Sequence, residues 1–193
     1  MSDRASQTSQ SSHVGLNNIA NQLTVARVIL VPLVVVGLLA GGTAWRMIAF
    51  AAFCLASFTD LLDGKLARSR GLVTNFGKIA DPVADKALTG AALVTLSALG
   101  ELTWWATAVI MVREVGVTLL RFWVIKYGVI AASPGGKLKT VLQILAICLY
   151  LLPWGNAIAR EAGMAAAVAA TVVTGLDYVV RAVRLRRGEG VRP

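Results

Sequence analysis

Acidic residues, cysteines and histidine are scarce in this sequence. Among 193 residues there are ten aspartates and glutamates, two cysteines and one histidine, against nineteen lysines and arginines. Cys54 and Cys148 both lie inside apolar stretches, so neither a disulfide framework nor a CxxC metal site is indicated, and we interpret them as packing residues. The N-terminal residues lack the basic segment, apolar core and cleavage site of a signal peptide, so we expect none.

Long apolar runs dominate the sequence instead. Hydrophobic residues make up 56% of the chain, whereas a soluble domain contains about 45–50%. A helix that crosses a bilayer core of about 30 Å needs about 20 mostly apolar residues. We therefore expect an all-α integral membrane protein with six transmembrane helices, near residues 23–42, 45–63, 80–100, 102–126, 138–154 and 163–183.

The predicted spans are joined by short connections, which indicates one domain rather than two. We expect this six-helix domain to cover residues 16–184. Residues 1–15 are polar and rich in serine and glutamine, so we expect a disordered tail there. Residues 185–193 form the predicted basic C-terminal tail.

The net charge of +9 is distributed unevenly along the chain. Most cations fall between the second and third spans, between the fourth and fifth, and in the tail: Lys65, Arg68, Arg70, Lys78, Lys126, Lys137, Lys139, Arg181, Arg184, Arg186, Arg187 and Arg192. The opposite loops offer only Arg46 and Arg160. This asymmetry predicts a multi-pass protein of the plasma membrane with both termini in the cytoplasm. Membrane topology thus explains most of the positive charge, and attraction of the cations to anionic lipid is a secondary reason for it. We therefore expect no nucleic-acid partner.

Four of the ten acidic residues stand close together. Asp60 and Asp63 fall at the end of the predicted second span, and Asp81 and Asp85 at the start of the third. Residues three or four apart share one face of a helix, and a short loop between antiparallel helices brings the two pairs together. Charges at such depth are costly and face an interior or a wet cavity. The carboxylates repel one another and need a counter-charge, and oxygen ligands without histidine or cysteine favour one or two Mg²⁺, Mn²⁺ or Ca²⁺ ions over Zn²⁺.

A second interpretation of the aspartates is an ordinary ion-pair network at the membrane edge. Its partners are four nearby cations: Lys65, Arg68, Lys78 and Lys86. The repeated three- and four-residue spacing favours the metal site, because intramembrane charge is rare. Gly64, next to Asp63, either leaves room for a ligand or allows close packing of helices.

The spacing of these residues resembles the signature of a known family. The pattern is Asp60-x-x-Asp63-Gly64-x-x-Ala67-Arg68, eight further residues, and then Gly77-x-x-x-Asp81-x-x-x-Asp85. Its eight fixed identities are similar to the motif of the CDP-alcohol phosphotransferases, and the resemblance extends from about Asn17 to the last span. It implies six transmembrane helices, usually in a homodimer, and transfer of a substituted phosphate from a CDP-linked donor to an alcohol with release of CMP.

The resemblance also implies a role for each motif residue. Two Mg²⁺ or Mn²⁺ ions are bound by the four aspartates: Asp60, Asp63, Asp81 and Asp85. Asp85 in addition deprotonates the attacking hydroxyl, Gly64 and Arg68 bind the CDP part of the donor, and Thr74 contacts it from the loop. Metal ions stabilise the charge of phosphoryl transfer, so these implied roles agree with the site expected from the residues.

The N-terminal part of the chain resembles one branch of this family. NIANQLTVARVILVP, residues 18–32, is similar to the N-x-P-N-x-L-T-x-x-R opening of phosphatidylglycerophosphate synthases, with Ala20 in place of the proline. Asn21, Thr24 and Arg27 either help to hold the nucleotide or begin a helix, with a threonine cap and an arginine that reaches to the surface.

A basic segment, residues 113–143, again resembles this branch, which uses a phosphate-bearing acceptor. We predict that four cations bind the acceptor phosphate: Arg113, Arg121, Lys137 and Lys139. Positive-inside charge alone accounts for the lysines but not for the two arginines. Arg113 and Glu114 also have the alternative of pairing with partners inside the membrane.

Together these features predict transfer of the phosphatidyl group from CDP-diacylglycerol to the 1-hydroxyl of glycerol 3-phosphate, giving phosphatidylglycerophosphate and CMP. Within the family, the alternatives are a cardiolipin synthase that uses phosphatidylglycerol and an inositol-phosphate transferase. A divalent-cation transporter is the alternative from another class. It is less favoured because the first, fifth and sixth predicted spans lack acidic residues except Asp177.

Overall fold

The computed structural model describes residues 19–70, 75–124 and 134–186. Within these ranges, residues 19–25, 60–70, 75–85, 122, 124 and 134 are described by their backbone alone. The described residues are helical except in short turns, which confirms the all-α class for this part of the chain. The predicted N-terminal tail, Thr74, Lys126 and the end of the basic tail after Arg186 lie outside the described residues.

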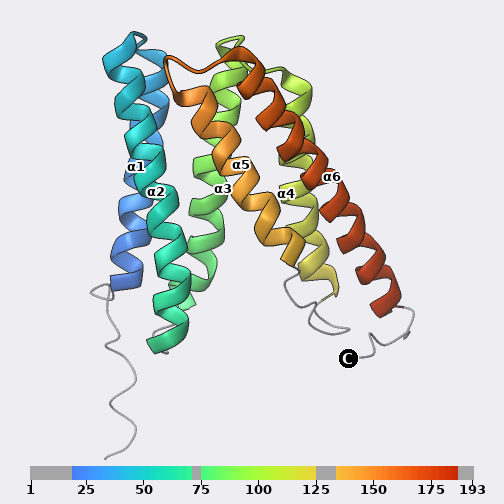
Figure 1. Cartoon of the computed structure of the whole chain (residues 1–193). Helices are drawn as coiled ribbons and strands as arrows, with labels where there is room; N and C mark the ends of the chain where they lie inside the picture. Colours follow the sequence, from blue (N-terminus) through green and yellow to red (C-terminus); the bar gives the residue numbers. More distant parts are fainter. Residues whose placement is uncertain (1–18, 71–74, 125–133, 187–193) are drawn as a thin grey trace, which may run out of the picture.

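Six helices make up the described part of the chain (Figure 1). They are α1 (Ile19–Leu39), α2 (Thr43–Arg70), α3 (Asn75–Ala98), α4 (Trp104–Val124), α5 (Pro134–Leu151) and α6 (Ala157–Arg186). Each helix overlaps one predicted span, but α2 continues beyond the predicted end at residue 63 and α3 begins before residue 80. The predicted limits followed the apolar runs, whereas the leucine, lysine, alanine and arginine residues beyond them are good helix formers.

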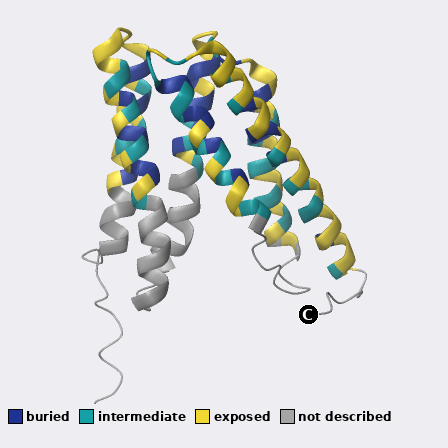
Figure 2. Cartoon of the chain, viewed as in Figure 1, coloured by how far each residue is buried: buried dark blue, intermediate teal, exposed yellow. Residues whose placement is uncertain are grey.

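The helices fall into two groups of three. α1 packs on α2 and α3, while α6 packs on α4 and α5, and contacts of α2 with α5 and of α3 with α4 join the groups. The groups meet at the end that carries the α1–α2, α3–α4 and α5–α6 turns, which we call the turn end (Figure 1). They diverge toward the other end, where α1 begins and α6 finishes, which we call the open end. Among the described residues, the buried positions lie mainly toward the turn end (Figure 2). The buried core side chains include Val34, Phe53, Leu93, Leu96, Ile110, Ile147 and Met164.

The outer surface of the helices is also apolar. Exposed large side chains occur on several helices: Ile29, Leu55, Phe58, Val112, Leu119, Ile158 and Val173. Among the described helices, α6 is the one that is long and apolar enough to cross a bilayer by length and composition. Shorter apolar segments are Ala26–Leu39, Thr43–Thr59 and Lys86–Ala98. Apolar surface of this extent is typical of contact with lipid or with another protein.

The α1–α2 hairpin depends on glycine. Gly41 and Gly42 form its turn with φ values of 71° and 78°, a region that side chains with a Cβ rarely adopt. At Gly37, a Cβ would lie 2.8 Å from the carbonyl oxygen of Trp45. The absence of a side chain there allows the two helix backbones to approach closely.

A charged cluster closes the turn end of the molecule. Arg46 Nη1 donates to Glu101 Oε1 at 2.6 Å, and the same guanidinium donates to the carbonyls of Tyr150 and Leu151 at 2.7 and 3.3 Å. Arg160 of α6 binds two further carbonyls near the end of α5. Because the last carbonyls of a helix lack partners within it, these two arginines cap α5 and tie it to α2 and α6.

The two cysteines lie side by side between α2 and α5. Their sulfur atoms are 3.7 Å apart, and both thiols are half-buried and free. Thiols in such a setting behave as small apolar side chains, which agrees with their interpretation as packing residues.

Candidate active site

The aspartate motif occupies the open-end halves of α2 and α3. Asp60 and Asp63 lie on α2, and Asp81 and Asp85 on α3, so both pairs are inside helices as their spacing predicted. The side chains of all four lie outside what the structure describes, as do those of Ala67 and Arg68. The metal-ligand, base and CDP-binding roles therefore stay predictions, including those of Gly64 and of Thr74.

One alternative for the N-terminal motif is wrong. The helix α1 begins at Ile19, so Thr24 lies inside it rather than at its cap. Arg27 is only 1% exposed and does not reach the surface. The prediction failed because residues 19–23 are compatible with a helix, which therefore starts a turn earlier. The side chains of Asn21 and Thr24 are not described, and their nucleotide-binding role stays a prediction.

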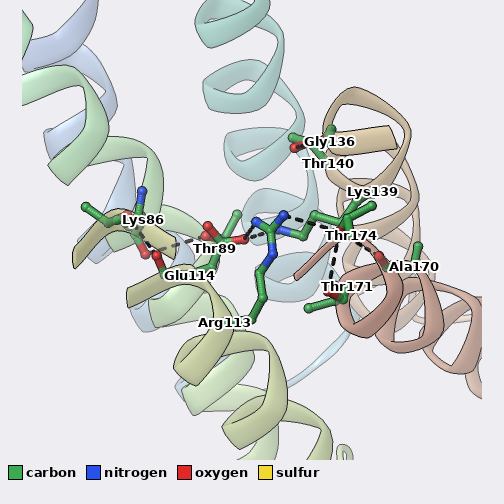
Figure 3. Close-up of polar contacts among 11 residues, drawn as sticks. Lys86, Thr89, Arg113, Glu114, Gly136, Lys139, Thr140, Ala170, Thr171 and Thr174 are labelled. Carbon is green, nitrogen blue, oxygen red and sulfur yellow. Dashed lines mark hydrogen bonds and ion pairs between the residues drawn. The ribbon is translucent and has the colours of Figure 1, made fainter. Parts of the chain in front are cut away.

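Three helices, α4, α5 and α6, bring polar side chains together (Figure 3). Lys139 of α5 is only 3% exposed, and its ammonium forms an ion pair with the carboxylate of Glu114 on α4. Nη1 of Arg113 lies 3.6 Å from Oε1 of the same carboxylate. The close-up also contains Lys86, which follows Asp85 on α3. We call Arg113, Glu114 and Lys139 the buried ionic cluster.

The third helix of this region, α6, contacts Arg113 through Thr174 and Gly175. Nη2 of Arg113 donates to the hydroxyl oxygen of Thr174 at 3.2 Å, and that hydroxyl itself donates to the carbonyl of Ala170 at 2.7 Å. At Gly175 a Cβ would stand 3.1 Å from Cγ of Arg113. Glycine thus lets the aliphatic part of the arginine lie against the backbone of α6.

The other two predicted acceptor cations do not join the cluster. Arg121 and Lys137 are both exposed, although they stand on the same helices as Arg113 and Lys139. Lys137 differs from Lys139 because residues two apart on a helix point to opposite sides. Arg121 and Lys137 thus lie outside the buried ionic cluster, and the phosphate-binding role of all four cations stays a prediction.

Further polar groups near the cluster escaped prediction from the sequence. Within the described part of the chain, Nε of Arg113, Oε1 of Gln143, Oγ1 of Thr171 and the hydroxyl of Tyr178 are buried without a hydrogen-bond partner. Gln143 follows Lys139 by one helical turn, and Thr171 and Tyr178 flank Thr174 at one-turn spacing. Buried polar groups without partners are uncommon and point to a bound ligand or water. Their helical spacing was the one signal in the sequence that could have revealed them.

The chain was compared with known proteins. The family model described as CDP-alcohol phosphatidyltransferase matches residues 17–174, which include the whole aspartate motif. The probable phosphatidylglycerophosphate synthase of Mycobacterium tuberculosis is 51% identical over 172 residues, which cover 86% of this chain and 82% of that protein.

Relatives of lower identity carry names for the same synthesis. The CDP-diacylglycerol–glycerol-3-phosphate 3-phosphatidyltransferase of Bacillus subtilis is 39% identical over 179 residues, covering 83% of this chain and 93% of that protein. The protein of the same name from Salmonella choleraesuis is 37% identical over 163 residues, covering 81% and 88%. Both the family match and these identities extend over most of the sequence. The chain belongs to the CDP-alcohol phosphatidyltransferase family.

Proposed function

We propose that the protein transfers the phosphatidyl group of CDP-diacylglycerol to glycerol 3-phosphate. The oxygen of the 1-hydroxyl forms a bond to the phosphatidyl phosphorus, the bond from that phosphorus to the CMP oxygen breaks, and the hydroxyl proton passes to a base. The products are phosphatidylglycerophosphate and CMP. The observation that carries the proposal is the identity of 51% over 86% of the chain with a relative named for this synthesis.

The donor half of the site is assigned to the aspartate motif. Four carboxylates on two consecutive helices are a suitable donor set for Mg²⁺ or Mn²⁺, which prefer oxygen ligands. When bound, two such ions would offset the charge of the diphosphate. Asp85 is the proposed base for the acceptor hydroxyl, and Gly64 and Arg68 are the proposed contacts of the CDP part.

The acceptor half is assigned to the buried ionic cluster. Lys139 stands 12 residues before the end of α5 at Leu151, and Asp85 stands 13 residues before the end of α3 at Ala98. Both helices finish at the turn end, so at 1.5 Å per residue the two positions lie at a similar depth of about 18–20 Å. A phosphate bound by Lys139 and Arg113 would thus lie at the level of the proposed base. Arginine binds phosphate with two parallel hydrogen bonds, and lysine as a point charge.

The proposed setting is a membrane that all six helices cross. Helices of 18 to 30 residues extend for about 27–45 Å, which is comparable with the thickness of a bilayer core, about 30 Å. The excess of lysine and arginine at the open end favours a cytoplasmic location for that end. Glycerol 3-phosphate is a soluble, charged molecule, and this orientation lets it enter from the cytoplasm. The family resemblance further suggests a homodimer.

A panel of acceptors tests the proposal. The purified protein is given CDP-diacylglycerol in mixed micelles with Mg²⁺, and CMP release is measured with glycerol 3-phosphate, phosphatidylglycerol, inositol phosphate or no acceptor. We expect release that depends on glycerol 3-phosphate. Release that depends on phosphatidylglycerol or inositol phosphate instead would assign the chain to another reaction of the family. Uptake of Mn²⁺ into proteoliposomes without CMP release would favour a transporter.

A further inference from the structure

A carboxylate lies where the proposed function calls for cations. Glu114 contacts both of the basic side chains assigned to the acceptor phosphate, although an anion at this position would by itself repel that phosphate. Its side chain is 16% exposed, so its charge is only partly screened by water. The position of Glu114 therefore needs a physical explanation.

Both cations that Glu114 contacts are largely shielded from water. The side chain of Lys139 is only 4% exposed and that of Arg113 only 16%. Two cations that must converge on one phosphate repel each other in an apolar interior, and each loses its hydration there. A carboxylate between them offsets both costs and holds the two head groups near each other before any acceptor is bound.

The geometry of α4 shows how one carboxylate reaches both cations. Arg113 and Glu114 are consecutive, so they point about 100° apart around the helix. Glu114 extends to Lys139 on α5, whereas Arg113 crosses to Thr174 on α6. Nη1 of Arg113 nevertheless lies 3.6 Å from Oε1 of Glu114 (Figure 3). The carboxylate of Glu114 thus contacts both the lysine that comes from α5 and the arginine that binds α6.

One nitrogen of Arg113 is held by α6, and another has no hydrogen-bond partner among the described residues. Thr174 uses its hydroxyl hydrogen for the carbonyl of Ala170, so a lone pair of its oxygen accepts from Nη2 of Arg113. Nε of Arg113 has no hydrogen-bond partner among the described residues. An arginine fixed in this way keeps an N–H group for an incoming anion.

We propose that Glu114 is a positioning residue for the acceptor phosphate: its carboxylate keeps the Lys139 ammonium and the Arg113 guanidinium together, charged and aimed at one site. This inference rests on the proposed function and adds Glu114 to it. Glu114 does not contact the reacting atoms and acts through the two cations. Loss of its charge would therefore weaken acceptor binding while leaving the donor site unchanged.

The test compares substrate constants of Glu114→Gln with those of the wild-type protein. We expect the KM for glycerol 3-phosphate to rise roughly tenfold, in line with the loss of a charge-assisted contact, and the KM for CDP-diacylglycerol to change less than about twofold. The matched control is Glu161→Gln, which removes an exposed carboxylate of α6 and should change neither constant. A lower kcat with both KM values changed, in a Glu114→Gln protein that keeps the wild-type melting temperature, would overturn the inference.

A double variant covers the case in which Glu114→Gln alone folds poorly because Lys139 is left without this counter-charge. Glu114→Gln combined with Lys139→Met removes both charges of the pair. Because Glu114 acts in part through Lys139, its loss should raise the KM for glycerol 3-phosphate by a smaller factor in the Lys139→Met background than in the wild-type protein, since interacting residues are not additive. Effects that multiply would contradict the inference. A wild-type protein that ignores glycerol 3-phosphate would overturn the proposed function itself, whereas an active wild type with an unchanged Glu114→Gln would overturn only the role of Glu114.

Discussion

Arg113 on α4 and Gly175 on α6 are in direct contact: a Cβ at Gly175 would lie 3.1 Å from Cγ of Arg113. The arginine lies against the backbone of α6 at Gly175, which has no side chain, and reaches the neighbouring Thr174 with its guanidinium. The glycine on α6 thereby determines how the side chain of Arg113 lies between α4 and α6.

Gly175→Ala is predicted to displace Arg113 by a few tenths of an ångström. Because small misplacements of binding groups have large kinetic effects, the KM for glycerol 3-phosphate should rise by roughly three- to tenfold. The control is Gly116→Ala on α4, where an added Cβ meets nothing within 4 Å. Steady-state kinetics with both substrates make the comparison, and equal constants for the two variants would contradict the role given to Gly175.

Arg113 and Arg121 should differ sharply as acceptor ligands. Arg113 is in the buried ionic cluster, whereas Arg121 is exposed. A charge-assisted hydrogen bond contributes about 1.5–3 kcal/mol, so Arg113→Ala should lower kcat/KM for glycerol 3-phosphate by about ten- to a hundredfold. Arg121→Ala should lower it by less than about threefold, as expected for an exposed charge. Equal losses in both variants would return Arg121 to the phosphate site.

Asp85→Asn tests the proposed base. The amide cannot accept the hydroxyl proton, so turnover should fall by about 10²–10⁴, the usual contribution of general base catalysis. CDP-diacylglycerol should still bind, as measured by its protection of the protein against heat. Near-normal turnover in this variant would remove Asp85 from the mechanism.

The Arg46–Glu101 pair at the turn end predicts a pH dependence of stability. The hydrogen bond from Arg46, followed by its positive charge, lowers the pKa of Glu101 below the usual value. The stabilising effect of the ionised Glu101 is therefore complete above the pKa of about 4.3 that a glutamate has in the unfolded chain. This effect is lost as the pH falls through the lowered pKa of Glu101 in the folded protein.

The variant Glu101→Gln measures this effect. Its melting temperature in detergent should be below that of the wild type at neutral pH, and the difference should shrink in acid. The loss of a charge-assisted hydrogen bond corresponds to about 1–3 kcal/mol. A difference in melting temperature that stays constant down to the lowest accessible pH would show that the charge of Glu101 does not contribute.

The six helices were predictable because apolar runs of about 20 residues dominate the sequence. The aspartate motif was placed on helices correctly because its spacing of three and four residues is itself helical. The ends of α2 and α3 were not predictable from apolar content, since the chain remains helical through polar residues such as Lys65 and Arg70.

The burial of the predicted acceptor cations could not be predicted from the sequence. Charge and resemblance gave Lys137 and Lys139 equal weight, but only one of two residues two positions apart can face the interior. Which one does so depends on the start of α5 at Pro134 and on the packing of α5 against α6 and α2. The pairing of Lys139 with Glu114 joins residues 25 positions apart in the chain, and a pairing between helices follows from tertiary packing rather than from local pattern.

The central claim is transfer to glycerol 3-phosphate, and radiolabelled glycerol 3-phosphate tests it most directly. The purified wild-type protein is incubated with CDP-diacylglycerol and Mg²⁺, and the label in the lipid phase is compared with the CMP released. We predict one labelled phosphatidylglycerophosphate for each CMP, with neither product formed in EDTA. CMP released without label in the lipid, or label transferred at full rate in EDTA, would contradict the proposed reaction.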